Sequence, residues 1–184
     1  HIVNTLSEAE LADIIYTYGE ERLSRRVSKA IILARSKERI TRTSVLADII
    51  RKVVPRRKKG RDNDPATRTF QALRIYINDE VGELKRGLNA AERILMPGGR
   101  LAVVAFHSLE DRCVKKVLAE RLGRNKGVSR HAIAQEPLDR TASFKLITKK
   151  PSYPTSLEVQ SNPRARSARL RVAERTTAPS WPRQ

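Results

Sequence analysis

Residues 96–106, MPGGRLAVVAF, decide the fold class of this chain. The segment 96–99 ends a helix, because proline cannot continue the helical hydrogen-bond ladder and the two glycines permit a reversed turn. The apolar run 101–106 follows without a polar interruption, which is typical of a strand buried on both faces of a parallel sheet. A helix, a tight turn and a buried strand together predict an α/β fold.

The residues before this turn carry the strongest helical pattern of the chain. Apolar side chains recur at steps of three and four, which predicts one continuous helix of about 25 to 30 residues. The stripe consists of Phe70, Leu73, Ile77, Val81, Leu84, Leu88, Ala91 and Leu95. Asn78, Asp79 and Glu80 lie inside it, and Asn and Asp are poor helix-interior residues that tend to need a reason.

Further upstream, residues 5–55 predict a compact all-helical unit. Ser7 and Glu10 have the spacing of a capping box at the start of its first helix. Gly19 closes that helix, because glycine adopts the conformation that ends a helix without a steric cost. The unit therefore begins with a well-delimited amphipathic helix.

Two more helices complete this unit. One spans about residues 21–37 at helical spacing, and Thr43 caps a shorter one that Pro55 ends. The basic run 56–61 then follows without periodicity. It predicts a linker or loop, with phosphate contact as the main competing interpretation.

After the apolar strand, the pattern predicts a helix over about 108–122 and two strands. Residues 144–148 form the first strand, and residues 168–173 alternate with period two, as in a half-exposed strand. The segment 151–166 between them holds three prolines and is a long connection. No internal repeat is found.

Composition and charge narrow the function. The 184 residues include 38 Lys and Arg against 20 Asp and Glu, a formal net charge of +18, which implies a polyanionic partner. No segment approaches the roughly 20 apolar residues that span a bilayer. The single cysteine, Cys113, excludes an internal disulfide framework and favours a reducing compartment. The three histidines lie too far apart in sequence to suggest a zinc site.

The most informative stretch follows the apolar strand directly. Residues 106–112, FHSLEDR, place five polar side chains just beyond its carboxyl end, which is where ligands bind in open α/β sheets. A local interpretation is equally good: Ser108 caps the next helix, and Asp111 completes a weaker capping box. His107 alone is more often a structural histidine than a general base. Both interpretations stay open on the pattern.

Several separate motifs carry a resemblance that spans nearly the whole chain. They are the segments 64–75, DPATRTFQALRI; 78–80, NDE; 97–101, PGGRL; 106–112, FHSLEDR; and 162–171, NPRARSARLR. In this order they closely resemble the bacterial small-subunit (16S) ribosomal RNA (cytosine-N4)-methyltransferases.

The resemblance implies the C-terminal half of a class I, Rossmann-like methyltransferase sheet domain plus an all-helical inserted subdomain. Residues 1–61 would be the inserted subdomain with its basic linker, and residues 62–184 the C-terminal part of the methyltransferase domain. The two final strands would be the closing antiparallel pair of its sheet. The family uses S-adenosylmethionine and methylates a cytosine in the decoding centre.

The family's cofactor motif lies before the inserted domain, and the chain opens at His1 inside running sequence. We therefore expect no cofactor-binding residues in this chain, and we expect this portion to be inactive alone. The partner would be the small ribosomal subunit and its 16S RNA in the cytoplasm, with neither membrane nor DNA. Whether the enzyme forms a homodimer stays open.

Methylation of an exocyclic amine requires acceptors that hold the NH₂ group. We predict that Ser108, Glu110 and Asp111 take this role and that His107 shapes the pocket. Arg112 and Arg68 would contact phosphate or pair with those acids. A basic surface would grip folded RNA through its backbone and shape. It comprises Arg25, Arg26, the run 56–61 with Arg56, Arg57, Lys58, Lys59 and Arg61, and Arg164, Arg166 and Arg169.

Two rival functions remain. The chain could be a non-catalytic RNA- or ribosome-binding module, which would need no cofactor residues. It could also be a DNA-binding helix-turn-helix protein, given its three basic helices before Pro55. The apolar strand and the polar stretch after it have no role in that second rival.

Overall fold

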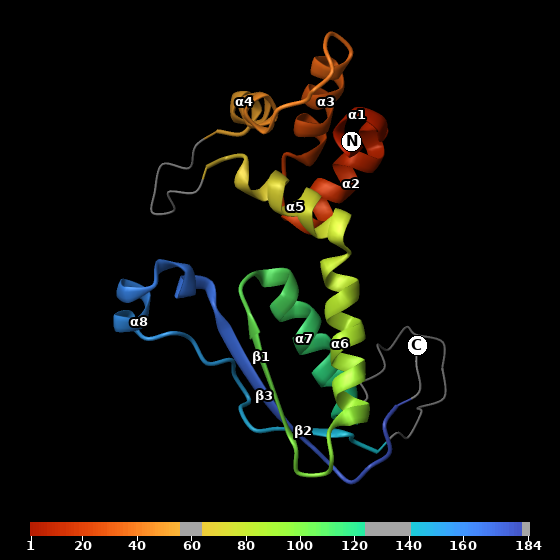
Figure 1. The fold of residues 1–184 in the computed structure, drawn as a ribbon, viewed down its shortest axis with the longest axis vertical. Coiled ribbons are helices and arrows are strands. Elements are labelled where there is room, and N and C mark those ends of the chain that lie inside the picture. The colour runs from red at the N-terminus through yellow and green to blue at the C-terminus, as the bar shows by residue number, and fades with distance from the viewer. Residues whose placement is uncertain (56–63, 124–140, 182–184) are drawn as a thin grey trace, which may run out of the picture. The chain divides into compact units, whose positions relative to one another are not determined.

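The computed structural model describes residues 1–55, 64–123 and 141–181. It divides into two compact units, His1–Glu80 and Val81–Gln184 (Figure 1). Each unit has its own hydrophobic core. The predicted basic linker residues Arg56, Arg57, Lys58 and Lys59 lie outside the described residues.

The first unit is all-helical, as predicted. It contains α1 (Ile2–Thr5), α2 (Glu8–Gly19), α3 (Ser24–Arg35), α4 (Thr43–Val53) and α5 (Thr67–Asn78). Fully buried side chains such as Leu11, Ile15, Val27, Ile31 and Ile50 form its core. They come from α2, α3 and α4, so the apolar stripes seen in the sequence do face one another.

The predicted helix starts in this unit are confirmed at α2 and wrong at α4. The Ser7 hydroxyl accepts from the Glu10 N–H at 3.3 Å, and the Glu10 carboxylate accepts from the Ser7 N–H at 2.8 Å. At α4 the residue before the helix is Arg42, whose side chain makes no capping bond. Thr43 is already helical, so its hydroxyl stands inside the first turn and not in front of it.

Gly19 does not close α2 by adopting the reversed conformation. Glu20 does so instead, with a φ of 50°. Gly19 lies inside the helix, where a Cβ atom would come within 2.7 Å of the Arg68 backbone oxygen of α5. The glycine is needed because two helix backbones approach closely at this point.

The prediction of one continuous helix over 70–95 is wrong. α5 ends at Asn78, Asp79 takes a left-handed conformation with a φ of 48°, and α6 (Glu80–Ile94) begins at the next residue. Asp tolerates this conformation better than most residues. The Glu80 carboxylate holds the junction by accepting from the Arg74 Nε–H at 2.7 Å.

The chain divides into its two compact units at this break, whereas the sequence predicts a division after residue 61. The difference arises because α5 packs on α2 within the first unit through Gly19. The assignment of residues 1–61 to an inserted subdomain, and of residues 62–184 to the methyltransferase domain, stays a prediction.

The second unit is a small sheet with helices, which confirms the predicted α/β class. Its strands are β1 (Arg100–Ala105), β2 (Phe144–Leu146) and β3 (Arg169–Arg175), in the order β1-β3-β2. Both pairs are antiparallel, so the expected closing pair of β2 and β3 is confirmed.

Helices cover one face of this sheet (Figure 1). α6 and α7 (Ser108–Arg121) contribute Leu88, Val114 and Leu118 to a core with Phe144 and Ala173 of the sheet. A short helix, α8 (Ser156–Ser161), and a 3₁₀ helix, η1 (Pro163–Ser167), lead into β3.

The prediction that β1 is buried on both faces of a parallel sheet is wrong for the described chain. Along the strand exposed and covered residues alternate, and the Val104 side chain is 52% exposed. Among the described residues β1 pairs only with β3, and that pairing is antiparallel. One of its faces packs on the core, and its other apolar face and other edge carry no described partner.

None of the described helices is long and apolar enough to cross a membrane.

Candidate functional site

The polar stretch after β1 forms the start of α7. His107 is the N-cap, and its Nδ1 accepts from the Glu110 N–H at 3.4 Å. In return Glu110 Oε2 accepts from the N–H groups of Phe106 at 2.8 Å and of His107 at 3.3 Å. A capping box is therefore present, but one residue earlier than predicted: His107 and Glu110 form it, not Ser108 and Asp111.

The two side chains of this box are electrostatically linked. His107 Nε2 lies 3.3 Å from Glu110 Oε1, yet it is buried and has no well-aligned hydrogen-bond partner among the described residues. Burial raises the pKa of Glu110, but the His107 side chain and the Phe106 N–H outweigh it and hold that pKa below its ordinary value. Glu110 is thus an ionised acceptor, and among the described residues the backbone N–H groups that it accepts from bind its Oε2 and not its Oε1.

Asp111 is committed to two arginines of β3. It is 7% exposed and accepts from Arg171 Nε at 2.7 Å, from Arg171 Nη2 at 3.2 Å and from Arg169 Nη1 at 2.9 Å. The two hydrogen bonds from Arg171, with the one from Arg169, hold the pKa of Asp111 below its ordinary value although burial opposes this. These hydrogen bonds connect the first turn of α7 to the beginning of β3.

An aromatic ring extends this cluster. The Arg169 guanidinium lies 5.9 Å from the centroid of the exposed Tyr153 ring, within the range of a cation–π contact. The residue before Tyr153 is fixed, because Ser152 exchanges two backbone hydrogen bonds of 2.9 Å with Leu170.

The sequence pattern did not point to Arg171 and Tyr153 as residues of this site. A signal for Arg171 was available: in a strand, side chains two residues apart lie on the same face, so the alternation over 168–173 places it beside Arg169. Nothing in the pattern indicated that Asp111 faces that strand. Tyr153 lies in a stretch without periodicity, which carries no comparable signal.

The remaining predicted site residues are not all brought together. Ser108 is half-buried in the first turn of α7, and Arg112 is exposed on the same helix. Arg164 and Arg166 are exposed on η1.

Arg68 belongs to the first unit. It donates to the Glu20 backbone oxygen at 3.0 Å and lies 3.9 Å from Glu21. The acids after β1 have partners within their own unit, namely His107, Arg169 and Arg171. The predicted contact of Arg68 with phosphate or with those acids stays a prediction.

Cys113 packs as predicted. It is buried in α7, and burial raises the pKa of its thiol, which disfavours the reactive thiolate. Within the ranges that the structure describes, no three His, Cys, Asp or Glu side chains gather as metal ligands would.

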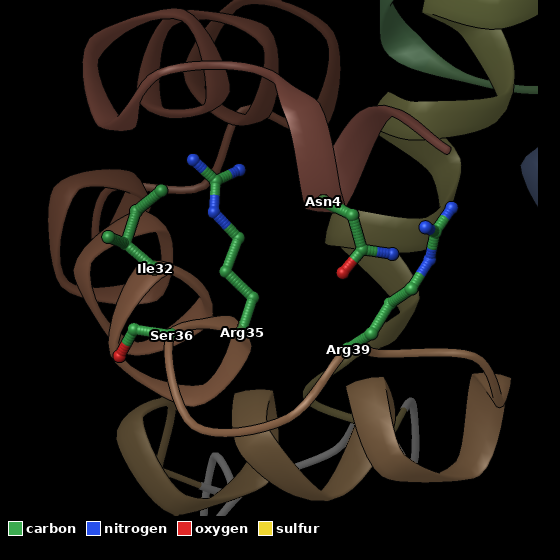
Figure 2. A pocket seen from close by; sticks show the side chains of 5 residues that line it. All are labelled: Asn4, Ile32, Arg35, Ser36 and Arg39. Carbon is green, nitrogen blue, oxygen red and sulfur yellow. The ribbon is translucent and has the colours of Figure 1, made fainter.

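A pocket of about 480 Å³ lies in the first unit, away from this polar stretch in sequence, and is lined by side chains of α1 and α3 and the turn after α3 (Figure 2). Its polar groups already have structural roles. Arg35 donates to the Val3 and Leu6 backbone oxygens at 3.0 and 2.6 Å, and the Asn4 amide exchanges two hydrogen bonds with the Ile40 backbone. The pocket is thus walled by groups that hold α1 in place.

Comparison with known proteins shows which protein family this chain resembles. The sequence profile of the MraW methylase family matches residues 1–176. A protein of Paramagnetospirillum magneticum called ribosomal RNA small subunit methyltransferase H is 59% identical over 180 residues, which cover 98% of this chain and 56% of that protein.

Two further relatives carry the same name. The Methylobacterium nodulans protein is 59% identical over 179 residues, 97% of this chain and 52% of its own length. The Bradyrhizobium diazoefficiens protein is 54% identical over 190 residues, 99% of this chain and 56% of its own length. The chain spans about half the length of the curated relatives it matches.

Proposed function

The chain belongs to the MraW methylase family, and from this we propose that it forms part of an enzyme that methylates N4 of a cytosine in small-subunit (16S) ribosomal RNA. The observation that carries the proposal is the 59% identity, over 98% of the chain, to a protein named as a small-subunit ribosomal RNA methyltransferase. The same observation favours a methyltransferase over a non-catalytic RNA-binding module.

The methyl donor of the proposed reaction is S-adenosylmethionine. Its two adjacent ribose hydroxyls are best bound by a carboxylate with both oxygens free to accept, and the described acids after β1 do not offer one. Both Asp111 oxygens accept from arginines, and Glu110 serves His107 and two backbone N–H groups. The donor would therefore be held by parts of the whole protein beyond this chain.

This chain would hold the nucleotide that is modified. A cytosine must leave its stack to be reached, at a cost of a few kcal/mol, and its amine must then be held in one orientation. Glu110 Oε1 and the Ser108 hydroxyl are proposed to accept from the amine, with His107 shaping the pocket beside them. The His107–Glu110 box sets the direction of that carboxylate.

Asp111 takes a positioning role in this proposal. Its oxygens are occupied by Arg169 and Arg171, so it acts on RNA through them and not by accepting from the amine. Charge supports the RNA contacts: the net charge is +18, and basic side chains that neutralise phosphates release counterions. The RNA-binding residues proposed are Arg112, Arg68, Arg56, Arg57, Lys58, Lys59, Arg164 and Arg166.

The natural substrate would be the small ribosomal subunit or its RNA in the cytoplasm. The experiment uses the whole protein that contains this chain, incubated with small subunits and with a methyl donor that carries a labelled methyl group. We expect label on N4 of a single cytosine, located by mass spectrometry of nuclease fragments.

Two variants assign the chemistry to the polar stretch. Glu110→Gln should lower kcat by about 100-fold, because the orienting charge is lost. The matched control Glu83→Gln changes an exposed carboxylate on α6 and should leave kcat unchanged. Equal kcat values for the two variants would show that Glu110 has no role in catalysis. RNA binding without any methyl transfer would favour the non-catalytic module.

A further inference from the structure

A second pocket, of about 420 Å³, lies between α2 and the start of α3 in the first unit. Its wall includes Asp13 and Tyr16 of α2, Arg22 of the connecting turn, and Ser24, Arg25 and Arg26 at the start of α3. The pocket belongs to the first unit, whereas the polar stretch after β1 belongs to the second.

The three arginine side chains of this wall form no ion pair that stabilises the described part of the fold. Arg22, Arg25 and Arg26 are exposed, and within residues 1–55, 64–123 and 141–181 none of them forms an ion pair with a carboxylate. Arg51 and Arg74 of the same unit, by contrast, each pair with acids of that unit. Of the described residues that line the pocket, Asp13 alone is acidic, so the wall is strongly positive.

The start of α3 adds donors to this charge. The residue before the helix, Leu23, makes no side-chain capping bond, and the Glu21 carboxylate accepts from the Leu23 N–H at 2.9 Å and not from the first turn. The Ser24 N–H donates to the Glu21 oxygen and the Val27 N–H to the Leu23 oxygen. The N–H groups of Arg25 and Arg26 are left without an acceptor among the described residues, at the positive end of the helix dipole.

A serine hydroxyl adds to the donor set. Ser24 belongs to the pocket wall and is 4% exposed, and its hydroxyl is not one of the described buried polar atoms that lack a partner. The hydroxyl, the helix start and the exposed arginines thus gather hydrogen-bond donors at one place, which suits an anionic acceptor.

The Tyr16 ring indicates which kind of molecule carries the anionic group. Its side chain is 62% exposed on the pocket wall, and an exposed aromatic ring beside a basic groove is a stacking surface for a nucleobase. An acidic protein segment would use the charge but leave the ring without a role.

We propose that this pocket binds a phosphodiester group of single-stranded RNA. Arg22, Arg25, Arg26, the Ser24 hydroxyl and the first-turn N–H groups of α3 contact the phosphate, and Tyr16 stacks on a neighbouring base. The inference rests on the proposed function, since it states how the helical unit of the chain holds the RNA substrate.

The first test compares two double variants of the full 184-residue chain. A fluorescent single-stranded RNA of about ten nucleotides is titrated at several salt concentrations and followed by anisotropy. Arg25→Gln with Arg26→Gln should weaken binding by about tenfold or more and reduce the slope of log K against log salt by about 0.7, because the pocket neutralises one phosphate and each phosphate that is no longer neutralised accounts for about 0.7. The control, Arg39→Gln with Arg42→Gln, removes the same charge from exposed arginines of the same unit that do not line this pocket and should weaken binding less than about threefold.

The second test separates stacking from charge. Tyr16→Leu should weaken binding by about fivefold or more without a change in the salt slope, while Tyr16→Phe should bind as the unsubstituted chain does. All of the substituted side chains are exposed, so thermal melts should match, which excludes misfolding as the cause.

Three results would overturn the inference. They are an equal loss of affinity for the two arginine pairs, unchanged RNA binding by Tyr16→Leu, and displacement of the RNA by polyglutamate as effective as that by an unlabelled RNA competitor. These results leave methyl transfer by the whole protein untouched. A failure of the proposed function would instead appear as absent methylation of the subunit RNA, with RNA binding by the pocket intact.

Discussion

Asp111 shows how one residue can join the local and the tertiary structure of this chain. It sits in the first turn of α7, where a carboxylate is favourable because of the helix dipole, yet its oxygens are taken by Arg169 and Arg171 of β3. The carboxylate neutralises two guanidinium groups that lie on one face of a strand and would otherwise repel each other. Its main contribution is to hold these arginines in place beside the end of β1.

We predict that Asp111→Asn lowers the free energy of unfolding by about 1 to 3 kcal/mol at neutral pH, because two charged donors lose their ionised acceptor. The folded-state pKa of Asp111 is depressed, so its stabilisation is complete above the unfolded value of about 4 and is lost as pH falls through the lower folded pKa. Urea unfolding of both chains between about pH 2.5 and 7 measures this. A stability difference that stays constant across that range would contradict it.

At the level of secondary-structure elements, the contact between α2 and α5 determines which helices belong to the first unit. Gly19 lets the α5 backbone approach so closely that a Cβ atom would lie 2.7 Å from the Arg68 oxygen and 3.2 Å from the Ala72 Cβ. Arg68 in turn donates to the Glu20 backbone oxygen, which adds a polar link to the contact. This packing is why α5 belongs to the helical unit although the basic run 56–61 precedes it.

We predict that Gly19→Ala destabilises the first unit by about 1 to 3 kcal/mol, because the neighbour is backbone and cannot move aside. The matched control is Gly87→Ala on α6, where nothing lies within 4 Å of the new Cβ. That change should raise stability by about 0.8 kcal/mol through helix propensity. Denaturant unfolding followed by circular dichroism compares the two, and equal effects would refute the close-contact role of Gly19.

On the scale of the whole molecule, the chain has two cores that share no residue. The second unit is organised around Glu92, which is 2% exposed. Its carboxylate accepts from the Ser143 hydroxyl at 2.6 Å, from Arg121 Nε at 3.0 Å and from the Trp181 N–H at 3.0 Å. Burial raises the pKa of Glu92, but these bonds outweigh it and hold that pKa below its ordinary value. The buried Glu92 carboxylate of α6 thus connects α7 with the residue before β2, Ser143, and with the segment after β3 that contains Trp181.

We predict that Glu92→Gln lowers the stability of the second unit by about 3 kcal/mol or more, because Arg121 would lose its buried counter-charge. The first unit should be unaffected. Glu83→Gln breaks an exposed pair with Arg86 on the same helix and should cost less than about 1 kcal/mol. Hydrogen exchange monitored in both units measures whether the loss of stability is confined to the second unit. Loss of protection in α2 and α3 together with α7 would show that the units do not unfold separately.

Features that depend on neighbours along the chain follow from the amino-acid sequence without further help. The capping box at Ser7, the turn at 96–99 and the helical unit were predicted because their signals lie within a few residues of one another. The family resemblance also came from contiguous motifs. For the site, the sequence located residues 107–112 as the important stretch but left its local and functional interpretations equally good.

Which residues meet, in contrast, is visible only in the folded chain. The partners of Asp111 lie 58 and 60 residues away in sequence, and the helix of 70–95 breaks at Asp79, where Arg74 and Glu80 hold a turn that no periodicity reveals. The apolar run of β1 has a covered and an open face because burial depends on what packs against a strand and not only on its own side chains. Local propensities act over a few residues, whereas partners and burial are set by the packing of elements distant in sequence.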